Sequence, residues 1–343
     1  MLYIFIVYLL LCLYKISFKN VKSIDEDALL HNRTMMINGI FVGIVFFSHF
    51  SGVVALSGYA NTIFVKILKK IGQLMVTTFL FYSGYGILES IKNKPDYMKT
   101  FFKNRIVKLF VSFSLAICLY LVLNWILGIS KPVNKILLSF IGWESVGNSN
   151  WFIFATFCLY FIVLISFNIF KEDNLKAILL SIIGTLLYIL FIIKVKRLGY
   201  WCDTALCFNL GMLISYFKDK LILFLKDNIN YLLTFMISLC IFGLCYLQGY
   251  NFIIYTIYSL SFVFLIFMLS LKIKIGNNML LFLGKNTFNI YILQRVSFIL
   301  FGVLGLKNHN VYLYFLVSVI FTLFLIFVFN KLIKIVCRIF KLS

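Results

Sequence analysis

Long apolar runs separated by short polar segments dominate the chain. Runs of this length match the roughly 20 residues that a helix needs to cross a hydrocarbon core of about 30 Å. They fall at about 1–15, 35–57, 71–91, 107–128, 151–170, 177–194, 202–217, 229–247, 251–271, 287–305 and 311–330. The pattern predicts an all-α fold, a polytopic transmembrane helical bundle of about eleven spans. Run 202–217 is the weakest, because it is short and contains Asp203.

Lysine and arginine are distributed unevenly among the segments that link these runs. If the N-terminus lies outside the cell, the cytoplasmic segments hold 22 of the 32 Lys and Arg residues and the outer segments hold nine. This excess follows the positive-inside rule and predicts an external N-terminus and a cytoplasmic C-terminus. Segment 92–108 is the most basic, with six of these residues, and its aromatic residues favour an interfacial helix that leads into the fourth span.

The composition agrees with a membrane protein and excludes an ordinary soluble domain. Of the 343 residues, 63% are hydrophobic and 13% are charged. The net charge of +21 lies mostly in short loops, so it indicates contact with anionic lipid headgroups and no nucleic acid partner. The eight cysteines lack metal-ligand spacing. We therefore expect them to be buried apolar side chains, with no disulfide framework and no metal site.

Residues 32–52 carry the strongest candidate for chemistry. The stretch starts at a basic edge and is almost wholly apolar as far as His49. An ionisable group deep in a membrane is costly to keep, so it is a functional-site hypothesis by default. Asn38 lies eleven residues earlier, a rotation of about 1100°, so the two side chains share one helix face. The alternative is a packing histidine that hydrogen-bonds to a neighbouring helix.

Five segments together resemble the bacterial acyltransferase-3 family of integral membrane O-acyltransferases, whose members acetylate sugars of cell-surface polysaccharides. In the family's order, they are MINGIFVGIVFFSHF (36–50), GQLMVTTFLFYSGYGILES (72–90), FFKNRIVKLF (101–110), NWFIFATFCLYF (150–161) and LGKNTFNIYIL (283–293). The resemblance covers about residues 33–330. It implies an N-terminal extra span with its connecting segment, 1–32, and a membrane acyltransferase-like domain, 33–343, with a ten-helix core.

The family's first core helix carries a basic residue, ten further residues and a histidine. His49 matches the histidine, which implies a general base that takes the proton of an acceptor hydroxyl. Asn38 stands at the basic position, which is a departure from the family. Arg33 does not replace it, because it lies about 160° round the helix from His49. A second departure is Gln294, where many relatives have histidine.

The resemblance also implies an acyl donor, cytoplasmic acetyl-CoA, as a co-substrate rather than a bound cofactor. The phosphates of the donor would meet Arg105, Lys103 and Lys108 in the basic segment, and Asn38 is a further candidate contact. Arg105 is the strongest of these, because it matches the family's basic position before the fourth span. The alternative for all three cations is ordinary positive-inside topology.

The candidates for binding an acceptor come first from the outer face. Asn150 and Trp151 begin the fifth span, and Glu144 lies in the loop before it. An aromatic ring in this position either stacks on a sugar or anchors the helix at the membrane interface.

Two further acceptor candidates lie within spans. Gln294 is next to Arg295, a charged residue in the tenth span that must face a polar interior or a partner. Tyr85 belongs to the segment Ser-Gly-Tyr-Gly at 83–86, whose small residues we expect to let two helices pack closely.

Together these residues predict a membrane O-acetyltransferase, an enzyme that transfers acyl groups other than aminoacyl groups. It would sit in the bacterial plasma membrane and move an acyl group from acetyl-CoA to a hydroxyl of a surface polysaccharide or its lipid-linked precursor. Its expected partners are membrane lipid, acyl-CoA and the glycan, and its oligomeric state stays open. The alternatives are a polysaccharide polymerase, a flippase or transporter, and a catalytically impaired relative, the last because of Asn38.

Overall fold

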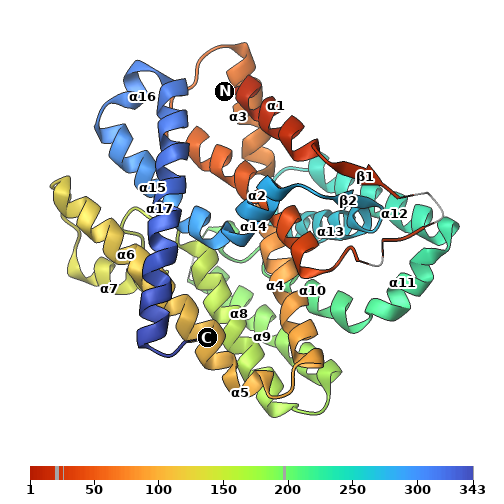
Figure 1. Ribbon diagram of the computed structural model, residues 1–343. Helices are drawn as coiled ribbons and strands as arrows, with labels where there is room; N and C mark the ends of the chain where they lie inside the picture. The colour runs from red at the N-terminus through yellow and green to blue at the C-terminus, as the bar shows by residue number, and fades with distance from the viewer. Residues whose placement is uncertain (20–22, 26, 196–197, 343) are drawn as a thin grey trace.

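Apolar helices make up most of the protein, because a backbone in lipid must satisfy its hydrogen bonds within its own segment. The structure is a computed structural model that describes residues 1–19, 23–25, 27–195 and 198–342 (Figure 1). Its helices are α1 (Leu2–Leu13), α2 (His31–Ser51), α3 (Tyr59–Ile71), α4 (Leu74–Asn93), α5 (Tyr97–Phe101), the π-helical η1 (Phe102–Val107), α6 (Lys108–Ile126), α7 (Val133–Ser139), α8 (Trp151–Ile169), α9 (Asn174–Lys194), the 3₁₀-helical η2 (Gly199–Trp201), α10 (Leu206–Tyr216), α11 (Lys218–Lys226), α12 (Asn228–Leu247), α13 (Phe252–Ser270), α14 (Asn278–Lys285), α15 (Thr287–Val303), α16 (Leu306–His309) and α17 (Val311–Ile339).

Each of the eleven predicted runs contains a helix, and the all-α class is confirmed. In the described chain, seven helical stretches are long and apolar enough to cross a membrane. They are α2, the continuous stretch from α5 through η1 to α6, α8, α9, α12, α13 and α17. Helices α1 and α15 are apolar but shorter. The protein is therefore a multi-pass membrane protein, whereas the count of eleven spans and the orientation stay predictions.

The run at 202–217 forms a short helix. Its helix, α10, has 11 residues and would cover only about 16 Å at 1.5 Å per residue. Nearly all of it is buried, and it packs along α4. Asp203 lies in the turn before α10, where it is fully buried. A short helix is tolerated at this depth because the surrounding helices shield it from lipid.

Two short strands join the N-terminal segment to the rest of the bundle. Strand β1 (Ile16–Phe18) pairs antiparallel with β2 (Ile273–Ile275), and Ser17 is opposite Lys274. Arg33 is tied to this region, because it donates a hydrogen bond to the carbonyl of Ile275 and lies 3.9 Å from the Asp25 carboxylate. Arg33 therefore makes contacts at the end of the bundle and does not contribute to the face of α2 that carries Asn38.

Glycine allows the closest helix contacts around the middle of the bundle. A methyl group at Gly84 of α4 would collide with the backbone carbonyl of Phe208 on α10, and one at Gly211 would collide with the carbonyl of Phe81. The same reciprocal contact occurs between α2 and α14, which Figure 1 shows side by side. The expectation that the small residues at 83–86 allow close packing is confirmed for Gly84.

We predict that Gly84→Ala lowers the thermal midpoint of the protein in detergent or nanodiscs. The added methyl forces α4 and α10 apart, and overpacking of this kind costs about 1–3 kcal/mol. Gly86→Ala is the matched control, because the same methyl at Gly86 meets no atom within 4 Å. The control should melt at or above the wild-type temperature. Equal midpoints for the two variants would contradict the close contact.

Candidate functional site

A cavity of about 790 Å³ lies among α2, α4, η1, α8 and the α14–α15 segment, and we call it the basic cavity. Its volume is typical of small-molecule sites, which span about 300–1,000 Å³. Glu89 is the one carboxylate among the described lining residues, and Lys92 pairs with it at 2.7 Å. The basic side chains that line the cavity are His31, Lys94, Arg105, Lys218 and Lys285. This excess of cations favours an anionic ligand.

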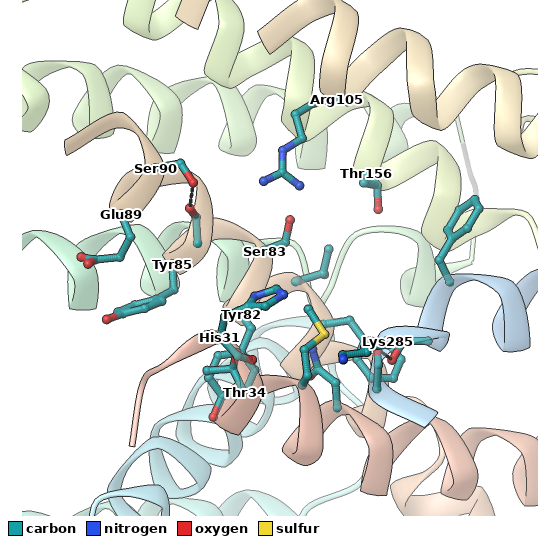
Figure 2. Close-up of a pocket in the computed structure, with 18 of the residues that line it drawn as sticks. His31, Thr34, Tyr82, Ser83, Tyr85, Glu89, Ser90, Arg105, Thr156 and Lys285 are labelled. Atoms are coloured by element: carbon teal, nitrogen blue, oxygen red, sulfur yellow. Dashed lines mark hydrogen bonds between the residues drawn. The ribbon is translucent and has the colours of Figure 1, made fainter. Parts of the chain in front are cut away.

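Arg105 reaches into the basic cavity from η1, the π-helical turn between α5 and α6. Such turns are frequent at functional sites because they disturb the regular helical register. The Nε of Arg105 donates a hydrogen bond to the Tyr97 hydroxyl at 2.8 Å. This bond fixes the side chain and leaves its two terminal nitrogens for a ligand. Figure 2 shows the guanidinium pointing across the cavity toward Ser83.

Asn38 lines the same cavity from α2. The residue is 8% exposed, and its Oδ1 has no hydrogen-bond partner in the described chain. A buried polar atom left unsatisfied costs about 1–3 kcal/mol, so this oxygen is available to a donor on a bound molecule. Asn38 therefore adds a hydrogen-bonding group, without charge, to a cavity whose lysine and arginine side chains come from other elements.

A second cavity, of about 350 Å³, lies beside His49, and we call it the histidine cavity. Trp151 forms one wall, and its ring lies 5.9 Å from the Tyr200 ring in an edge-to-face arrangement. The other lining residues with polar side chains are Ser48, His49, Gln73, Ser149, Asn150, Tyr200, Tyr291 and Arg295. The described lining includes neither Asp nor Glu. Aromatic walls with a few convergent polar groups are typical of a binding site for a small polar molecule.

Gln294 holds the imidazole of His49. Its amide nitrogen lies 2.8 Å from Nδ1 of His49 and also donates to the carbonyl oxygen of Tyr291 at 3.2 Å. A carbonyl is an acceptor only, which assigns the amide nitrogen, not the amide oxygen, to this side. Nδ1 of His49 then accepts a hydrogen bond, and a neutral ring carries its proton on Nε2. Nε2 is the nitrogen that is left for a ligand.

Tyr291 lines both cavities, and its side chain is almost completely buried. Its ring lies 5.8 Å from the His49 ring and 5.2 Å from Phe152, which lines the basic cavity. Gln73, before the start of α4, lines the histidine cavity, and Lys94, after its end, lines the basic cavity. The two cavities therefore lie toward opposite ends of α4, with Tyr291 as their common wall.

The predicted acceptor residues are divided between several places. Trp151 and Asn150 do line the histidine cavity, with His49. Tyr85 lines the basic cavity instead. Gln294 contributes to the site through its hydrogen bond to His49. Glu144 lines neither cavity.

The predicted donor residues are also separated. Arg105 and Asn38 line the basic cavity together. Lys103 is exposed, and neither Lys103 nor Lys108 belongs to the described lining. Because side chains two residues apart on a helix point in very different directions, only one member of a basic cluster enters the cavity from η1.

Sequence reasoning missed several lining residues. Lys285 and Tyr291 lie within the segment LGKNTFNIYIL, which carried part of the family resemblance, so that segment was the available signal. Gln73 begins another such segment, and its amide donates to the buried Asp203 at 2.6 Å. Lys94 and Lys218 lie between predicted spans, in basic segments that the positive-inside rule already explains.

Comparison with known families gives one match. The model of an acyltransferase domain family, acyltransferase 3, matches residues 37–331, which is most of the chain. The matched region begins within α2 and ends within α17, so it includes His49, Tyr291, the whole lining of the histidine cavity and most of the lining of the basic cavity. Neither the curated proteins nor the solved structures gave a match.

We predict that His49 carries its proton on Nε2 in the resting protein. Nitrogen-15 NMR of protein labelled at its three histidines distinguishes the tautomers, and the spectrum of His49→Gln identifies the signals of His49. Gln294→Glu places a carboxylate beside Nδ1, and a carboxylate accepts only, so this variant should move the proton to Nδ1. A wild-type ring already protonated at Nδ1 would contradict the arrangement.

Proposed function

Because the chain belongs to the acyltransferase-3 family of membrane acyltransferases, we propose that it transfers an acetyl group from acetyl-CoA to a hydroxyl of a surface polysaccharide or its lipid-linked precursor. The observation that carries this proposal is the pair of cavities that meet at Tyr291, one rich in cations and the other containing an oriented histidine. A transferase that joins a donor and an acceptor from opposite faces of a membrane needs two such sites in contact.

The basic cavity is the proposed donor site. Coenzyme A carries several phosphate charges, and Arg105, Lys285 and Lys94 would neutralise them at the end of the bundle where segment 92–108 lies. The thioester would then reach toward Tyr291 along α2, past Asn38, whose free Oδ1 suits an amide N–H of the pantetheine arm. In this arrangement Asn38 binds the donor without charge, and Arg105 supplies the cation.

The histidine cavity is the proposed acceptor site. The acceptor oxygen attacks the thioester carbonyl carbon, a C–O bond forms, and the C–S bond breaks to release the thiolate of coenzyme A. The proton of the hydroxyl passes to the imidazole of His49 and from there to the leaving thiolate. For Nε2 to accept that proton, the ring must first hold its proton on Nδ1. A half-turn of the Gln294 amide, which gives up its hydrogen bond to the Tyr291 carbonyl and then accepts from Nδ1–H, allows this tautomer.

The family match and a measurement of activity distinguish this proposal from its alternatives. The family match covers the histidine cavity and most of the basic cavity, which favours a transferase over a polysaccharide polymerase or a flippase. A catalytically impaired relative is the alternative that Asn38 keeps open, and consumption of acetyl-CoA by the purified protein distinguishes it from an active enzyme. The expected location is the bacterial plasma membrane.

We predict that His49→Ala abolishes acetyl transfer while the protein still folds. A positioned general base contributes about 10²–10⁴ in rate. His49→Gln should be equally inactive, because an amide makes hydrogen bonds but takes up no proton. His309→Ala is the control, since that histidine is exposed and lines neither cavity. A folded His49→Ala protein with near wild-type acetylation would rule out the base assignment.

We predict that Arg105→Ala raises the KM for acetyl-CoA by about 10- to 100-fold, the effect of losing charge-assisted hydrogen bonds to a phosphate. Lys103→Ala, two residues away and outside the lining, should leave KM unchanged. Asn38→Arg should help little, because Arg105 already supplies the charge. Kinetics in proteoliposomes test all three variants. A lower KM for Asn38→Arg together with an unchanged KM for Arg105→Ala would show that Arg105 does not bind the donor.

A further inference from the structure

Arg295 is a charged side chain in the middle of α15 that has no acidic partner in the described chain. It is half-buried and lines the histidine cavity with His49 and Trp151. None of the ion pairs between described residues includes it. A guanidinium at this depth is costly to keep and normally pairs with an anion or lines a polar pathway. The missing anion is therefore expected on a bound molecule.

Asp203, which contacts the cavity lining through Gln73, already has hydrogen-bond partners on both carboxylate oxygens. Asp203 accepts a hydrogen bond from Gln73 on one carboxylate oxygen, at 2.6 Å, and from the Tyr250 hydroxyl on the other, at 3.1 Å. Both contacts come from neutral donors, and they hold the carboxylate behind Gln73, outside the lining. Asp203 thus shapes the wall of the cavity and leaves Arg295 without a counter-charge.

Tyr291 also separates Arg295 from the proposed binding site for coenzyme A, so Arg295 does not neutralise the phosphates of the donor. Those phosphates have the cations of the basic cavity, which Tyr291 separates from Arg295. Trp151 and Tyr200 face the same space as Arg295 with their rings 5.9 Å apart, and such rings stack on the apolar face of a sugar. The cavity therefore combines a surface for a sugar ring with one fixed cation.

We propose that Arg295 binds an anionic group on the glycan acceptor, so that the preferred acceptor is a sugar that carries a carboxylate or a phosphate. An arginine fork matches either group through two parallel N–H···O hydrogen bonds. This inference rests on the proposed function, since it names the acceptor class of the same transfer. Arg295 thus selects the acceptor, while His49 acts on its hydroxyl.

The test compares three acceptors that share one sugar and one alkyl chain: a neutral alkyl glucoside, the corresponding alkyl glucuronide, and an alkyl glucosyl phosphodiester. The two anionic compounds separate a carboxylate from a phosphate as the source of the charge. Wild-type protein in nanodiscs should use at least one of them with a kcat/KM about 10- to 100-fold above that of the glucoside. Equal use of all three acceptors would overturn the proposal.

The variant Arg295→Gln should remove the preference by raising the KM of the anionic acceptor much more than the KM of the glucoside. Arg295→Lys, which keeps the charge, should restore part of the preference. Lys307→Gln is the matched control, because it removes one exposed cation that lines neither cavity. An equal loss of kcat with all acceptors would instead mean that Arg295 stabilises the oxyanion of the transfer step, and would overturn its role in selection.

A binding measurement keeps this inference separate from the proposed function. Trp151 lines the cavity, so a bound acceptor should change tryptophan fluorescence. If wild-type protein consumes no acetyl-CoA, the proposed function fails. Tighter binding of the glucuronide or phosphodiester than of the glucoside, lost in Arg295→Gln, would still support an anion site. Equal binding of all three compounds would overturn it.

Discussion

A helical bundle in lipid has no solvent to satisfy a polar atom in its interior, so each such atom needs a protein partner or a cavity. Many interior polar residues of the described chain meet this constraint in one of two ways. Asn209 donates to Ser181, and Ser297 bonds to Thr322 at 2.7 Å, so these side chains join neighbouring helices. Asn38, His49 and Arg295 face the cavities instead. The polar side chains that face the cavities define the site.

Close helix packing gives these few residues their positions. Backbone contact between α2 and α14 and between α4 and α10, made possible by glycine, fixes the positions of α2, α4 and α14, which line the cavities. α2 then reaches both cavities from one face, with Asn38 in one and His49 in the other. Gln294 on α15 orients the imidazole, and Tyr291, one turn earlier on the same helix, separates the two spaces. The chemistry is thus built on helices rather than on mobile loops.

The structural features that could be predicted from the sequence are those that depend on a single segment. The helical period places Asn38 and His49 on one face, and hydropathy locates the helices, because both are local properties. Lys285, Gln73 and Tyr291 enter the site through contacts between distant segments, which hydropathy does not encode. Helix α12 has hardly any buried residues and α2 is mostly buried, although both are apolar, so burial too depends on packing. Arg105 enters the cavity and Lys103 does not, because η1 decides which side chain faces inward.

The central claim is that donor and acceptor meet at Tyr291 from opposite faces of the membrane. The most direct test uses inside-out membrane vesicles, which present the cytoplasmic face outward, with radiolabelled acetyl-CoA added outside and the glycan acceptor sealed inside. The account predicts that labelled O-acetyl groups appear on the enclosed glycan while acetyl-CoA itself stays outside. Label on the glycan only when donor and acceptor share one compartment would contradict it.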